Sequence, residues 1–94
     1  MRAKLITEIR IETGPDGDHL WGEFSKRETF QSDPQVGDVL KYRMKSGAGK
    51  VPLPITHRRP DPSRQNEEEI RLDGSAVIAD IHTLNVGGWQ LDHP

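Results

Sequence analysis

The feature that most restricts the fold is a strict alternation of apolar and polar residues near the N-terminus. In AKLITEIRIET, residues 3–13, Leu5, Thr7, Ile9 and Ile11 fall on one face, and mostly charged side chains fall on the other. Successive side chains of a strand point to opposite sides, so a period of two is typical of a strand with one buried face. The sequence therefore predicts a half-buried strand here.

Two turn signals divide the alternating stretches into hairpins. In GPDGD, Pro15 suits the second position of a type I turn, and Gly17 can adopt the positive φ of a residue that closes a hairpin. Asp73 and Gly74 stand between two apolar runs, which indicates a two-residue hairpin turn. Each signal predicts that the strands on either side pair with each other.

Residues 19–30 are expected to form the return strand of the first hairpin. Leu20 and Phe24 share one phase and are predicted to point inward. The apolar phase slips before Phe30, which indicates a bulge near residues 26 and 27.

Two later segments also show strand periodicity. Residues 39–45 alternate between an apolar face, which we expect to be buried, and a face that is wholly basic. Residues 75–83 predict another strand, and the pattern does not decide which of its faces is buried. The faces of that strand would be Val77, Ala79 and Ile81 on one side, and Ile78, Asp80 and His82 on the other.

These strands predict one all-β domain over residues 1–94, either a small antiparallel barrel or a strongly bent sheet of five to six strands. An α+β arrangement is the alternative. No periodic pattern follows Lys45, so residues 46–67 are expected to form one long basic loop rich in Pro and Gly, and the sequence leaves open whether that loop is mobile. The edges of so small a sheet could pair with a second copy and form a homodimer.

Composition excludes several classes of site. The chain has no cysteine, which excludes disulfides, thiolate catalysis and zinc sites with sulfur ligands. It has neither the unbroken apolar stretch of a signal peptide nor the roughly 20 apolar residues of a membrane span. We therefore expect a cytoplasmic protein that does not contact a membrane, and we expect no cofactor.

The charges are unevenly distributed although the formal net charge is only −2. Between residues 41 and 64 there is one acid, Asp61, and the rest of the chain is strongly acidic. Such clustering can draw an acidic partner through charge. The alternative is a solvated strand face that resists edge pairing. The seven basic residues of this segment are Lys41, Arg43, Lys45, Lys50, Arg58, Arg59 and Arg64.

The first functional hypothesis is a non-enzymatic binding protein, of the inhibitor or immunity type, that docks an acidic protein through these residues and His57. Trp21 and Trp89 could serve as surface anchors, although packing in the fold is the usual role of so large a side chain. A small nucleic-acid-binding barrel is the alternative, which the scarcity of aromatic residues and the acidic balance disfavour.

A metal-independent phosphodiesterase or ribonuclease is the third hypothesis. It would use His57 beside Arg58 and Arg59, with His82 as the second acid or base. Asp80 and His82 could begin a metal site, but no third ligand follows at a recognisable spacing. We therefore expect neither catalytic nor metal-binding residues.

Overall fold

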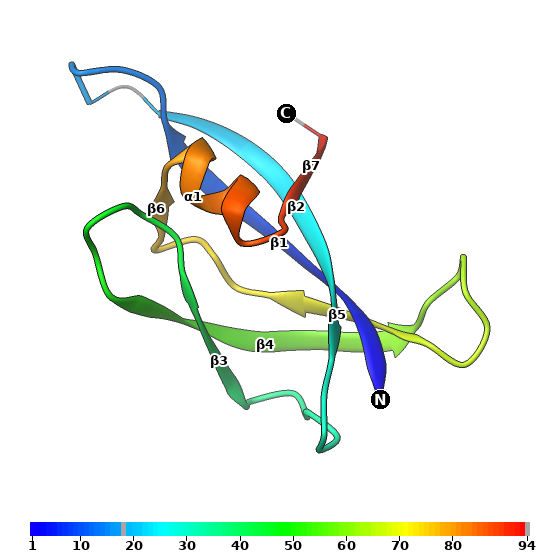
Figure 1. Cartoon of the computed structure of the whole chain (residues 1–94). Helices are drawn as coiled ribbons and strands as arrows, with labels where there is room; N and C mark the ends of the chain where they lie inside the picture. Colours follow the sequence, from blue (N-terminus) through cyan, green and yellow to red (C-terminus); the bar gives the residue numbers. More distant parts are fainter. Residues whose placement is uncertain (18, 94) are drawn as a thin grey trace.

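The computed structural model describes residues 1–17 and 19–93, which form a mostly β structure with one short helix (Figure 1). Seven strands belong to one sheet with the order β3-β4-β5-β1-β2-β7, and β6 pairs with β1 off this path. The elements are β1 (Arg2–Glu12), β2 (His19–Thr29), β3 (Val39–Arg43), β4 (Lys50–Pro60), β5 (Glu68–Leu72), β6 (Ile78–Ala79), α1 (Ile81–Val86) and β7 (Gln90–His93).

The first hairpin agrees with the sequence prediction. β1 and β2 pair antiparallel along their whole length, and the predicted face of β1 is buried from Leu5 to Ile9. The N–H of Gly17 donates to the carbonyl oxygen of Gly14 at 3.4 Å, and Gly17 has a φ of 79°. This is the type of turn that the glycine was expected to permit.

Two details of β2 differ from the prediction. Leu20 has the inward phase of Phe24 but lies near the end of the hairpin, outside the core cluster, and stays 66% exposed. The β1–β2 register runs without a shift, so there is no bulge at residues 26 and 27 in this pairing. Phe30 has the same phase as Leu20 and Phe24, so the apolar phase does not slip, and polar side chains, including Lys26, fill the inward positions between Phe24 and Phe30.

The predicted hairpin at Asp73 and Gly74 is wrong. β5 and β6 do not pair with each other; both pair in parallel with the same edge of β1, so the sheet is mixed rather than antiparallel. Gly74 connects them and packs directly on β1, where a Cβ atom would collide with the side chains of Ile9 and Thr7. This glycine is needed for close approach and not for a two-residue turn.

The predicted loop over residues 46–67 is wrong in its central part, because residues 50–60 form β4, an eleven-residue strand. The N–H of Ile55 donates to Asp38 on the β3 side. Alternate residues of a strand point their N–H groups the same way, so the nitrogen atoms of Pro52 and Pro54 point to the other side. Pairing with β5 begins only at Ile55, so Pro52 removes no hydrogen bond from the sheet, and Pro54 stands at the end of this pairing, where its carbonyl oxygen accepts from the N–H of Asp73 at 2.9 Å.

The predicted strand over residues 75–83 is replaced by the two-residue β6 followed by α1. Val77 and Ala79 are buried, whereas Ile81 lies on the helix and is 46% exposed. Asp80 is the N-cap of the helix: Oδ1 accepts from the N–H of Thr83 at 2.7 Å, and Oδ2 accepts from the N–H of Ser46 at 2.6 Å. One carboxylate therefore begins the helix and ties it to the turn between β3 and β4.

The sheet is strongly curled but open. β3 and β7 end the path without pairing with each other, so no closed barrel forms. Tyr42 of β3 nevertheless meets Trp89, which precedes β7, with the two rings edge to face and their centroids 5.6 Å apart. The inner face of the sheet thus encloses a core to which α1 contributes Leu84.

Lys26 of β2 occupies the centre of this closure. Its Nζ lies 5.0 Å from the ring centroid of Tyr42 and 5.7 Å from that of Trp89. It donates to the carbonyl oxygen of Gly87 at 2.8 Å and lies 3.3 Å from Glu28 Oε2. The Tyr42 hydroxyl donates to the same carboxylate oxygen at 3.1 Å, and burial, followed by the charge and hydrogen bond of Glu28, raises the pKa of Tyr42. One cation therefore connects β2, β3 and the α1–β7 segment.

We predict that Lys26→Ala lowers the free energy of unfolding by about 2 kcal/mol, because it removes two cation–π contacts, leaves the carbonyl oxygen of Gly87 without its donor and leaves Glu28 without its ion-pair partner. Lys41→Ala, at an exposed strand position, should change it by less than about 0.5 kcal/mol. Urea denaturation followed by tryptophan fluorescence measures both variants. An equal loss of unfolding free energy in the two variants would show that the contact between the β3 and β7 ends of the sheet does not depend on Lys26.

Asp80 makes stability depend on pH. Its hydrogen bonds with the Thr83 side chain and with the N–H groups of Ser46 and Thr83 lower its pKa to about 2, from 3.8. Because the pKa in the folded chain lies below the unfolded value, the carboxylate stabilises the fold above pH 3.8, and this contribution is lost as the pH falls toward about 2. Asp80→Asn should cost about 1 kcal/mol at neutral pH, and the difference from the unmodified chain should narrow over that range. A difference that is constant from pH 6 to pH 2 would contradict this role.

Candidate binding surface

Three basic residues gather on the outer face of the β3–β4 hairpin. Lys41 and Arg43 alternate with inward side chains of β3, and Lys50 of β4 is the cross-strand partner of Arg43. Such partners have Cβ atoms about 5 Å apart, and residues two apart on a strand are separated by about 7 Å. All three side chains are exposed. We call Lys41, Arg43 and Lys50 the hairpin patch.

The other four basic residues of the segment pair with carboxylates that lie outside residues 41–64. The seven therefore do not form one free surface: the described residues place a carboxylate within 4.0 Å of four of them, and of none in the hairpin patch. Along β4 alone they are spread from Lys50 to Arg59, or about 30 Å. The ion pairs are Lys45–Glu12 (3.2 Å), Arg58–Asp33 (2.7 Å), Arg59–Glu69 (2.6 Å) and Arg64–Glu67 (3.7 Å).

The two tryptophans have different environments. Trp89 is 2% exposed and belongs to the core, so its suggested role as a surface anchor is wrong. Trp21 is 47% exposed on β2, with the guanidinium of Arg10 lying 5.6 Å from its ring centroid. Trp21 lines a depression together with His57 and Arg71, and no residue of the hairpin patch lines that depression.

The histidines of the catalytic hypothesis line different depressions. His57 lies on β4, with Nδ1 3.0 Å from Thr56 Oγ1, whereas His82 lies on α1 in a depression of about 230 Å³ beside Arg43. The carboxylate of Asp80 is committed to the helix cap, and the helix replaces the strand on which it would have shared a face with His82. Among residues 1–17 and 19–93, no three potential ligands cluster to hold a metal ion.

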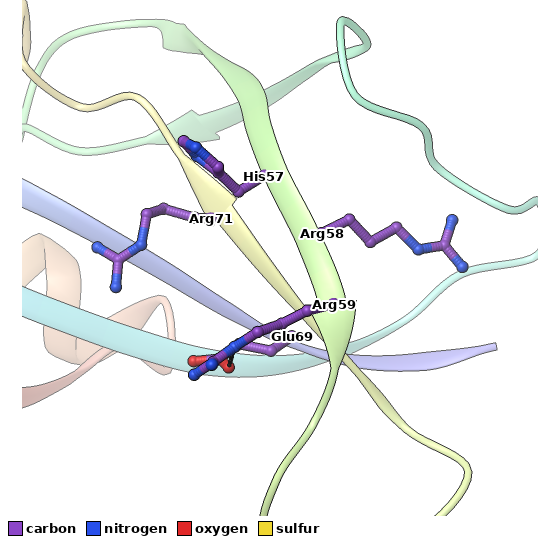
Figure 2. A pocket seen from close by; sticks show the side chains of 5 residues that line it. All are labelled: His57, Arg58, Arg59, Glu69 and Arg71. Atoms are coloured by element: carbon purple, nitrogen blue, oxygen red, sulfur yellow. Dashed lines mark hydrogen bonds and ion pairs between the residues drawn. The ribbon is translucent and has the colours of Figure 1, made fainter.

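A depression of about 280 Å³ lies on the outer face where β4 meets β5, lined by His57, Arg58, Arg59, Glu69 and Arg71 (Figure 2). Arg58 points away from the other side chains, and Arg59 lies over Glu69 (Figure 2). Arg71 was not among the residues singled out in the sequence. Its alternation with Ile70 and Leu72 could have placed it on the outer face, but only the register shows that it stands opposite His57.

Comparisons with models of protein families, with curated proteins and with solved structures found no match. The one helix of the described chain, α1, has six residues, and nothing in that part of the chain combines the length and apolar character that a membrane-crossing helix needs.

Proposed function

We propose that the protein is a non-enzymatic binding protein, of the inhibitor or immunity type, that docks an acidic protein through the hairpin patch. The observation that carries the proposal is the contrast between Lys41, Arg43 and Lys50, which have no carboxylate within ion-pair distance in the described chain, and the four neighbouring cations that do. Arg43 and Lys50 stand directly opposite each other. Like charges in that position destabilise a sheet, and carboxylates of a partner would relieve the repulsion.

The strand geometry supports docking at this place. Pro52 and Pro54 stiffen the part of β4 next to the patch, so little conformational entropy is lost when a partner binds there. The residues are exposed at the end of the sheet, where β3 is an edge strand. A rigid surface with an uncompensated positive charge is suited to steer an acidic protein into contact.

A protein partner fits better than a nucleic acid. Binding of single strands usually uses exposed aromatic side chains next to the cations. Tyr42, the aromatic residue of β3, points inward and is hydrogen-bonded, and Trp21 lines a different depression, beside His57 and Arg71. We include a cytoplasmic location in the proposal, as expected from the sequence.

A homodimer remains a prediction, based on the unpaired edges of the sheet. The free edges of the path are β3 and β7. Lys41 and Arg43 oppose the pairing of one β3 with another, because the strands would bring like charges together. A homodimer by strand addition is therefore more compatible with β7.

We predict that Lys41→Glu/Arg43→Glu weakens binding of the native partner at least tenfold, mainly through a slower association rate that depends less on salt. Arg2→Glu/Arg64→Glu reverses the same number of charges on another part of the surface and should change binding less than twofold. The partner is first captured from the host lysate with the unmodified chain, and surface plasmon resonance then measures all three forms.

Two results would contradict the proposal. Equal binding by both double variants would show that the hairpin patch is not part of the interface. Association with mixed single- and double-stranded oligonucleotides, with a steep loss of affinity as salt rises and dependence on Lys41 and Arg43, would identify phosphates as the target instead.

A further inference from the structure

Two hydrogen-bonding side chains face each other across β4 and β5 with few partners of their own. His57 and Arg71 are cross-strand partners, and both line the depression shown in Figure 2. Because partners in register lie on the same face, the imidazole and the guanidinium can reach one bound group. Both residues are exposed.

The other charged residues of this depression are already committed. Arg59 Nε lies 2.6 Å from Glu69 Oε2, so that pair is neutralised within the chain. Arg58 donates to the carbonyl oxygen of Pro34 at 2.7 Å on the other side of the strand. The remaining donors are therefore those of Arg71 and His57.

Arg71 is held only loosely. Its nearest carboxylate in the described chain is Glu23, at 4.0 Å, and none of its five N–H groups makes a side-chain hydrogen bond with the described residues. The Nδ1 atom of His57 contacts Thr56 Oγ1, and Nε2 makes no hydrogen bond with the described residues. A guanidinium fork with a ring nitrogen beside it matches the geometry of an oxyanion.

Acidic residues on the neighbouring surface limit the number of negative groups that a ligand of this site can carry. An adjoining depression of about 380 Å³ shares His57 and Arg71 but also contains the carboxylates of Glu8 and Asp73. These acids would repel a second anionic group next to the first. The surface therefore suits one isolated oxyanion and not a chain of phosphates.

We propose that Arg71 and His57 form a binding site for a single oxyanion group, a carboxylate or a phosphate. Arg71 would contact two oxygens of the group, and His57 Nε2 would contact a third or share one of them. Nothing in this site depends on the hairpin patch, which begins seven residues earlier on β4, about 23 Å away along the strand. The oxyanion belongs either to a small free anion or to a side chain of a bound protein.

Titration of the ¹⁵N-labelled chain tests the proposal. The probes are inorganic phosphate, acetate and an N-acetylated, C-amidated Gly-Glu-Gly peptide, each compared with chloride at the same ionic strength. We expect saturable shifts of the amide signals of Thr56, His57 and Arg71 with at least one probe. Tighter binding of the peptide than of acetate would identify a protein side chain as the source, and the reverse order would identify a free anion.

Three variants locate the site. Arg71→Gln should remove the saturable shifts, and Arg71→Lys, which keeps the charge but not the fork, should weaken binding about tenfold. Lys41→Gln should leave them unchanged, which separates this site from the proposed partner interface. Far-ultraviolet circular dichroism confirms that each variant is folded. No saturable shift in the unmodified chain, or equal binding by Arg71→Gln or Arg71→Lys, would overturn the proposal.

Discussion

The curled sheet is held together by a cation that contacts two aromatic rings. The end strands of an open sheet have no hydrogen bonds to each other, so side chains must hold them together when the sheet curls. Lys26 does this by contacting Tyr42 of β3 and Trp89 before β7, with Glu28 balancing its charge. In a chain with 32% hydrophobic residues, such polar closure supplements a thin apolar core. A lysine on the inner face of the sheet therefore packs with the aromatic residues that border the core.

The closure also determines which side chains are available for binding. With Tyr42 directed inward against Lys26, its neighbours Lys41 and Arg43 must point outward, because side chains of a strand alternate. The aromatic residue that could have supported base stacking is thereby used in the core. The hairpin patch is therefore cationic without an aromatic group beside it, and this is the basis on which we propose an acidic protein, and not a nucleic acid, as the partner.

The sequence predicted what depends on local periodicity. The alternation around Leu5 and the turn at Gly17 specify the first hairpin, and the basic face of β3 follows in the same way. The wrong predictions of secondary structure arise where contacts with other strands override the local preference of a residue. Gly74 resembles a hairpin residue but serves close packing on β1. The prolines of β4 resemble those of a loop, but their nitrogen atoms point away from β3, to the side where pairing with β5 begins only at Ile55. Neither case is visible without knowing which strands are neighbours.

The same limit applies to the charges of the candidate sites, because the sequence does not show which acids lie beside which cations after folding. A count along the chain finds seven cations against one acid between residues 41 and 64, yet the partners of Lys45, Arg58 and Arg59 come from outside that window. Coulomb energy depends on separation in space, so an acid brought beside a cation by strand pairing outweighs many residues of like charge along the sequence. The informative quantity is therefore the set of cations that remain without an acid after folding. By that measure the proposed binding surface contracts from seven cations to the three of the β3–β4 hairpin, and Arg71, whose nearest carboxylate in the described chain lies only at the 4.0 Å limit, becomes a second candidate.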